Sequence, residues 1–123
     1  MDQERRGLKF QFDAAAEIAP ESSPSATVAA RVTELSPSGC YLEIPAPFEV
    51  RTPVLVKIFH SAEYFEAKAM VIDVKPTVGM GLIFRDVRPN FREVLQKWIL
   101  AAMYNQKKIR GRDLAKHPAP GQR

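Results

Sequence analysis

Residues 28–44 read VAARVTELSPSGCYLEI, and this stretch decides the fold class. Apolar side chains alternate with others on both sides of a central turn sequence, at Val28, Ala30, Val32, Cys40, Leu42 and Ile44. Alternation with a period of two is typical of a strand with one buried face. The SPSG sequence at 36–39 is typical of a tight turn. The stretch therefore predicts two antiparallel strands joined at residues 36–39.

Four more strand-like segments lie around this pair, at residues 10–14, 54–59, 64–74 and 80–84. Segments rich in proline, serine or glycine separate them, at 20–25, 45–53 and 76–79, and residues 60–63 are predicted to form a hairpin turn. Short strands this close together, with no helix between them, are typical of an antiparallel barrel or sandwich. The alternation alone leaves these two architectures open.

One amphipathic helix is predicted after the last strand. Its apolar positions recur at helical spacing, at Phe91, Val94, Leu95, Trp98, Ile99, Ala102 and Met103. Asn90 is predicted to cap its start, with Glu93 completing a capping box. We expect the apolar stripe to pack across one mouth of the barrel, with Trp98 in the core.

Length and composition limit the classes to which the chain can belong. A chain of 123 residues suits one domain and can bury a core without disulfides or metals. Its single cysteine, Cys40, excludes an internal disulfide and is predicted to be a buried, inert side chain. No apolar run approaches the ~18 residues that span a membrane, and the polar N-terminus is unlike a secretory signal. These features predict a cytoplasmic protein without a membrane span.

The net charge of +4 is concentrated near the ends of the chain. The C-terminal cations are Lys107, Lys108, Arg110, Arg112, Lys116 and Arg123, and Asp113 is the only acid among them. Because glycine and proline accompany these charges, residues 105–123 are predicted to form a disordered basic tail. A nucleic-acid-binding barrel would instead carry cations between exposed aromatic residues on its strands. The charge pattern therefore argues against nucleic acid as a partner.

No set of side chains predicts an enzyme or a metal site. His60 and His117 are far apart and lack the neighbouring cysteines or paired carboxylates that metal sites need. No serine lies in a nucleophile elbow, and the GMG sequence at 79–81 begins a strand rather than a phosphate-binding loop. We therefore expect no catalytic residue, no metal and no cofactor.

A cationic segment near the N-terminus contains Arg5, Arg6 and Lys9, with Gly7 permitting a bend. Arginine binds phosphate through two parallel hydrogen bonds, contacts guanine O6 and N7, and stacks on a base. Residues 1–9 are predicted to be a flexible hook that folds over a ligand. By itself the segment is more typical of a solvated terminus.

The turn that follows the second strand carries Glu34, Ser36 and Gly39. Ser36 can bond to the local backbone, and Gly39 is expected to permit a positive φ and a close approach of ligand. The Glu34 carboxylate is an acceptor that suits the N1–H and N2–H₂ donors of guanine. Taken alone, the turn is also typical of an ordinary hairpin.

Hook and turn, in this order on this strand pattern, resemble the PilZ domain family. That family pairs an Arg-x-x-x-Arg hook with an Asp/Asn-x-Ser-x-x-Gly turn. Arg5 and Lys9 fall on the two hook positions, and Glu34, Ser36 and Gly39 fall on the turn positions. The GMGLIF sequence at 79–84 is similar to the family's Gly-x-Gly-x-x-Phe strand. The resemblance extends over residues 4–103.

This resemblance implies a six-stranded antiparallel β-barrel capped by a C-terminal helix, within residues 10–104. It also implies that the chain binds cyclic di-GMP and passes the signal to a downstream protein. Two departures bear on affinity, because Lys9 lacks the planar fork of arginine and Glu34 is one methylene longer than aspartate. Each weakened base contact costs about 1–3 kcal/mol. The alternative reading is a protein-interaction module of motility or pilus-type regulation that has lost the nucleotide.

Overall fold

A computed structural model describes residues 9–116 of the chain. The elements are β1 (Phe10–Pro20), β2 (Val28–Ser36), β3 (Gly39–Glu43), β4 (Pro53–His60), β5 (Glu63–Lys75), β6 (Gly79–Asp86) and the helix α2 (Pro89–Lys116). The strands close into a barrel in the order β1-β2-β3-β6-β5-β4, and β4 pairs antiparallel with β1 to complete the ring. This confirms the six-stranded antiparallel barrel with one C-terminal helix.

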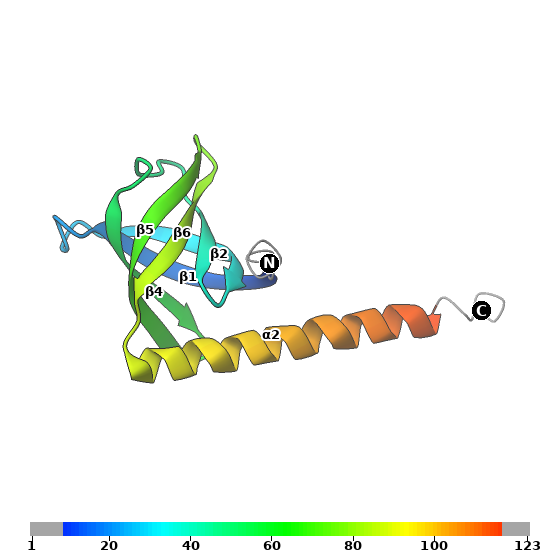
Figure 1. Cartoon of the computed structure of the whole chain (residues 1–123). Coiled ribbons are helices and arrows are strands. Elements are labelled where there is room, and N and C mark those ends of the chain that lie inside the picture. Colours follow the sequence, from blue (N-terminus) through cyan, green and yellow to red (C-terminus); the bar gives the residue numbers. More distant parts are fainter. Residues whose placement is uncertain (1–8, 117–123) are drawn as a thin grey trace, which may run out of the picture.

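The barrel interior is filled by the inward members of the alternating strands. Val32 and Leu42, from the stretch that predicts the fold, are fully buried, and Phe65 is the largest of the fully buried side chains. The first half of α2 lies across one end of the barrel, against β5 and β1, and the rest of the helix extends past it (Figure 1). Trp98 is buried where the helix meets the barrel, as its place in the apolar stripe predicts.

The hairpin between β4 and β5 has a two-residue loop, because His60 pairs with Glu63 across it. Ser61 and Ala62 both have positive φ, 49° and 64°. Positive φ at both central residues is the signature of a type I′ turn, whose twist matches that of the flanking strands. The predicted hairpin turn at residues 60–63 is confirmed.

Two β-bulges determine which side chains of β2 and β5 face outward. The register of β2 against β3 shifts between Val32 and Glu34, and that of β5 against β6 shifts between Val71 and Asp73. A bulge adds one residue to a strand and reverses the alternation beyond it. Glu34 and Asp73, which a strict alternation would direct inward with Val32 and Val71, therefore face the outside of the barrel.

Both ends of the helix differ from the sequence prediction. The helix begins at Pro89 rather than after an Asn90 cap, and the backbone N–H groups of Phe91 and Arg92 donate to the Arg88 carbonyl. Proline suits the first helical position, because its missing N–H would have no partner there. At the other end α2 continues to Lys116, whereas a tail was expected from residue 105.

Candidate functional site

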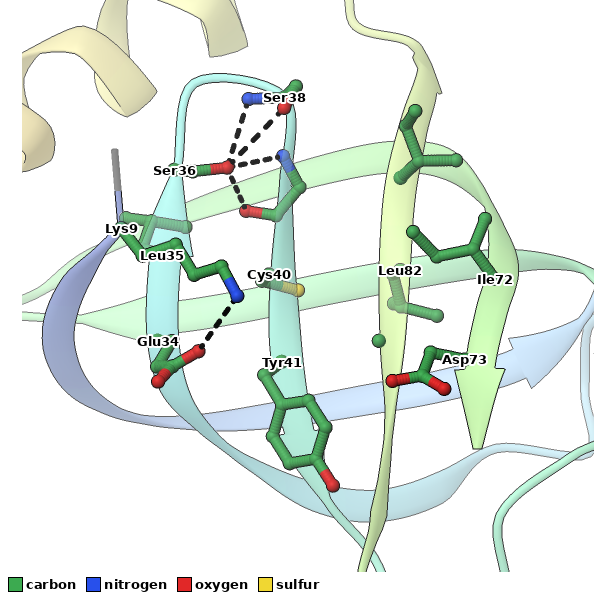
Figure 2. A pocket seen from close by; sticks show the side chains of 13 residues that line it. Lys9, Glu34, Leu35, Ser36, Ser38, Cys40, Tyr41, Ile72, Asp73 and Leu82 are labelled. Carbon is green, nitrogen blue, oxygen red and sulfur yellow. Dashed lines mark hydrogen bonds and ion pairs between the residues drawn. The ribbon is translucent and has the colours of Figure 1, made fainter. Parts of the chain in front are cut away.

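The turn between β2 and β3 is organised by one buried hydroxyl. Ser36 Oγ accepts hydrogen bonds from the backbone N–H groups of Ser38, at 3.2 Å, and Gly39, at 3.1 Å. It lies 3.3 Å from the Gly39 carbonyl oxygen, to which its own O–H donates. Figure 2 shows these bonds converging on Ser36. The local bonding that the sequence suggested for Ser36 is confirmed, and it fixes the shape of the turn.

Gly39 is required here for a different reason from the one expected. No glycine among the described residues has a positive φ. A Cβ at Gly39 would lie only 2.0 Å from the backbone oxygen of Leu82 on β6, where no real Cβ atom can be placed. The glycine therefore lets the turn approach β6, and the Ser38 carbonyl accepts a hydrogen bond from the Phe84 N–H at 2.8 Å.

An ion pair lies beside this turn. Lys9 Nζ is 3.9 Å from Glu34 Oε1, and both side chains are about half exposed, at 58% and 46%. A pair this long and this exposed contributes little to stability. The ion pair can therefore break at little cost, which leaves the Lys9 ammonium and the Glu34 carboxylate free to contact a ligand.

A cavity of about 260 Å³ opens on the outer face of the barrel next to the turn. Four of the predicted site residues, Lys9, Glu34, Ser36 and Gly39, line it together. The other two, Arg5 and Arg6, lie outside the described residues. The structure thus brings every described member of the predicted site to one cavity.

Among the other residues that line this cavity are Tyr41, Asp73 and Gly81, which the sequence analysis does not assign to the site. Tyr41 pairs with Gly81 and Gly81 pairs with Asp73 across neighbouring strands. Burial raises the pKa of the Tyr41 phenol, and the carboxylates of Asp73, Glu43 and Glu34 raise it further. Alternation around the turn could have identified Tyr41 as outward-facing. No local signal would have identified Asp73, because the bulge in β5 decides its direction.

Cys40 also borders the cavity but has its side chain in the core. Burial raises the pKa of its thiol to about 12, so the thiol stays protonated at neutral pH and is a poor nucleophile. This confirms the expected buried cysteine. Among the side chains of residues 9–105 no group of three His, Cys, Asp or Glu could hold a metal ion. No helix within residues 9–116 is long and apolar enough to cross a membrane.

Comparison with solved structures finds the same fold at low sequence identity. The PilZ domain of CeSA from a cellulose-synthesizing bacterium is 18% identical, with a TM-score of 0.60 over 77% of this chain and 97% of its own. The PilZ domain of Escherichia coli YcgR, solved with c-di-GMP, is 12% identical, with a TM-score of 0.68 over 85% of this chain and 95% of its own.

The Bacillus subtilis inhibitor of motility MotI (DgrA) is 14% identical, with a TM-score of 0.64 over 79% of this chain and 50% of its own. No curated protein sequence matches the chain. The family model of the PilZ domain matches residues 2–101. Because this match extends over most of the sequence and agrees with the barrel and helix described above, the chain belongs to the PilZ domain family.

Proposed function

We propose that this domain is a cyclic di-GMP-binding signalling domain. The observation that carries the proposal is the convergence of Lys9, Glu34, Ser36 and Gly39 on one outward-facing cavity, in a chain of the PilZ family. The solved YcgR domain, which shares the fold, contains c-di-GMP.

In this proposal the ligand lies over the Ser36 turn and the hook closes on it. Arg5 and Arg6 bind the phosphates or stack on the bases, since guanidinium groups do both. Lys9 leaves its weak pair with Glu34 for a phosphate, and the freed Glu34 carboxylate accepts hydrogen bonds from a guanine edge. The hook orders on binding, and the ordered hook and the ligand together form a new surface on the protein.

That surface is the part of the domain that a downstream protein would bind. Binding, rather than covalent chemistry, is the activity we infer, and a downstream protein in the cytoplasm recognises the ligand-bound form. The domain then acts as an adaptor without a catalytic residue, a metal or a cofactor.

One observation favours the alternative, a protein-interaction module without nucleotide. Among residues 9–105 the charged groups that line the cavity are two carboxylates, Glu34 and Asp73, and one cation, Lys9. This balance opposes a ligand with two phosphates unless the arginines of the hook offset it. The MotI structure, whose name describes inhibition of motility, shares the fold and agrees equally with this alternative.

Calorimetric titration of the purified protein with cyclic di-GMP tests the proposal directly. We expect saturable binding that Arg5→Ala abolishes while leaving the melting temperature unchanged. Lys9→Arg should strengthen binding, because it restores a planar group that can stack and bond bidentately. Wild-type protein with no heat change at millimolar ligand would favour the interaction module. An equal loss of stability in Arg5→Ala would show that the hook is structural.

A further inference from the structure

The two carboxylates that reach the cavity do so by the same structural device. Glu34 follows the bulge in β2, and Asp73 follows the bulge in β5. Each bulge turns a position that would face the core onto the outer face of the barrel. Bulges of this kind occur next to functional sites, where they redirect a side chain. Two independent irregularities thus place two acceptors on one face.

The residues between these carboxylates line the same cavity. Glu34 pairs with Tyr41, Tyr41 with Gly81, and Gly81 with Asp73, so the four lie in one row across β2, β3, β6 and β5. A Cβ at Gly81 would meet nothing closer than 3.6 Å, at Asp73 Cβ. The Asp73 carboxylate extends from β5 toward β6, and the Tyr41 ring lies on the β3 side of that strand (Figure 2). A group that takes the place of a side chain at Gly81 would therefore contact Asp73, Ile72 and Tyr41 without a clash.

Glu34 and Asp73, at the two ends of this row, differ in their ion pairing. Glu34 is paired with Lys9, whereas no cation among residues 9–105 lies within ion-pairing distance of Asp73. Neighbouring strands are ~4.8 Å apart, so the two positions are three strand spacings, or about 14 Å, apart measured along the curved sheet. The two carboxylates are too far apart to contact the same base edge. Asp73 therefore has to be considered as a separate acceptor.

We propose that Asp73 is a specificity-determining residue of this site, and that it reads the N1–H and N2–H₂ edge of a guanine lying over Gly81 beside Tyr41. An ionised carboxylate has two acceptor oxygens and no donor, which complements the two adjacent donors of guanine. Adenine presents an acceptor at N1, and a carboxylate repels it. This inference rests on the proposed binding of cyclic di-GMP and adds a residue from β5 that the hook and turn motifs do not contain.

The effect of removing the Asp73 charge has opposite signs under the two possible roles. If Asp73 makes no contact with the ligand, its negative charge only repels the two phosphates, and Asp73→Asn strengthens binding. As the acceptor of a guanine edge, Asp73 contributes a bidentate contact, and Asp73→Asn weakens binding about tenfold to a hundredfold. The sign of the change therefore decides the role.

Glu43 provides a matched control. Its carboxylate also raises the pKa of Tyr41, so it lies in the same electrostatic environment, but it does not line the cavity. Glu43→Gln removes one negative charge without removing a contact, and cyclic di-GMP should bind it as tightly as the wild type or a few-fold more tightly. The experiment titrates wild type, Asp73→Asn and Glu43→Gln with cyclic di-GMP and with cyclic di-AMP, and records the melting temperature of each.

The expected result is weaker cyclic di-GMP binding by Asp73→Asn alone, a smaller preference over cyclic di-AMP in that variant, and unchanged melting temperatures. Binding by Asp73→Asn that equals or exceeds that of the wild type would overturn the role of Asp73 and leave the proposed function intact. A markedly lower melting temperature of Asp73→Asn would overturn it in favour of a structural role. Wild-type protein that binds neither nucleotide would overturn the proposed function, and this inference with it.

Discussion

At the scale of single residues, Gly39 decides whether the Ser36 turn can approach β6. A Cβ there would lie 2.0 Å from the Leu82 carbonyl oxygen, and both partners are backbone, which cannot yield as a flexible side chain would. We expect Gly39→Ala to lower the free energy of unfolding by at least about 3 kcal/mol, the upper range for overpacking. Urea denaturation followed by the fluorescence of Trp98 measures it.

Gly81→Ala is the matched control on the opposite strand. The nearest atom to a Cβ at Gly81 is 3.6 Å away, an ordinary contact, and its φ is not positive. Alanine there should leave stability unchanged or raise it by about 0.5–1 kcal/mol, because it restricts the unfolded chain. Equal losses from the two substitutions would show that the close approach is not what requires glycine at position 39.

The candidate site shows which residues a sequence can identify. Ser36 and Gly39 could be predicted because their roles are local, a hydroxyl bonded to its own turn and a glycine in that turn. Asp73 could not, because alternation along β5 directs it inward with Val71. The direction of the Asp73 side chain depends on a bulge in the pairing of β5 with β6. The local sequence pattern of β5 does not show which strand it pairs with.

At the scale of elements, α2 is held by one buried aromatic side chain and its neighbours. Trp98 is 3% exposed, and its ring lies 5.4 Å from that of Phe12 and 6.4 Å from that of Phe65, between centroids. Trp98→Ala should lower the free energy of unfolding by roughly 3–5 kcal/mol. Chemical denaturation followed by circular dichroism measures the loss, since the variant lacks the fluorophore.

Leu100 is the control on the same helix, because it is 64% exposed. Leu100→Ala should change stability by less than about 0.5 kcal/mol. If Trp98→Ala had as small an effect as Leu100→Ala, the helix would not be packed on the barrel. Its stripe would then be open to a protein partner.

The strands and the helix could be predicted to different degrees. Alternation predicts most of the strands, because one face of each is buried in the barrel, whereas residues 54–59 are predicted from a nearly continuous apolar run. The helix was found from its stripe, but its ends were not. Asn90 has the chemistry of a cap, yet Pro89 begins the helix, since the fixed φ of proline suits the first position. The charges and glycine after residue 105 suggested a disordered tail, whereas the helix continues to Lys116.

At the scale of the whole molecule, the closing contact is the pairing of β1 with β4. Alternation identifies strands but not their neighbours, so it left barrel and sandwich equally open. The resemblance to a known family, carried by the ordered motifs, decided for the barrel. The bulges in β2 and β5 lie in two other strand pairs of this closed sheet, where each bends its strand locally.

The attachment of the helix to the barrel is predicted to depend on pH through Glu63. The hydrogen bond from Lys97 Nζ, 2.5 Å from Glu63 Oε2, lowers the pKa of the Glu63 carboxyl, and the Trp98 N–H and the charges of Lys97 and His60 lower it further against an opposing effect of burial. A carboxyl whose pKa is lower in the folded state stabilises the fold above its unfolded pKa of about 4.5. That contribution is lost as the pH falls through the lowered value.

Glu63→Gln should therefore lower the melting temperature near pH 7, and the difference from wild type should shrink towards zero as the pH falls through the lowered pKa of Glu63. The fluorescence of Trp98, the single tryptophan, reports the melt directly at the contact in question. Lys97→Met should reproduce most of the loss, and the double variant should lose less than the sum of the two, because both side chains belong to one interaction. A difference that stays constant from pH 7 to 3, or grows towards acid, would mean that Glu63 does not hold α2 through its charge.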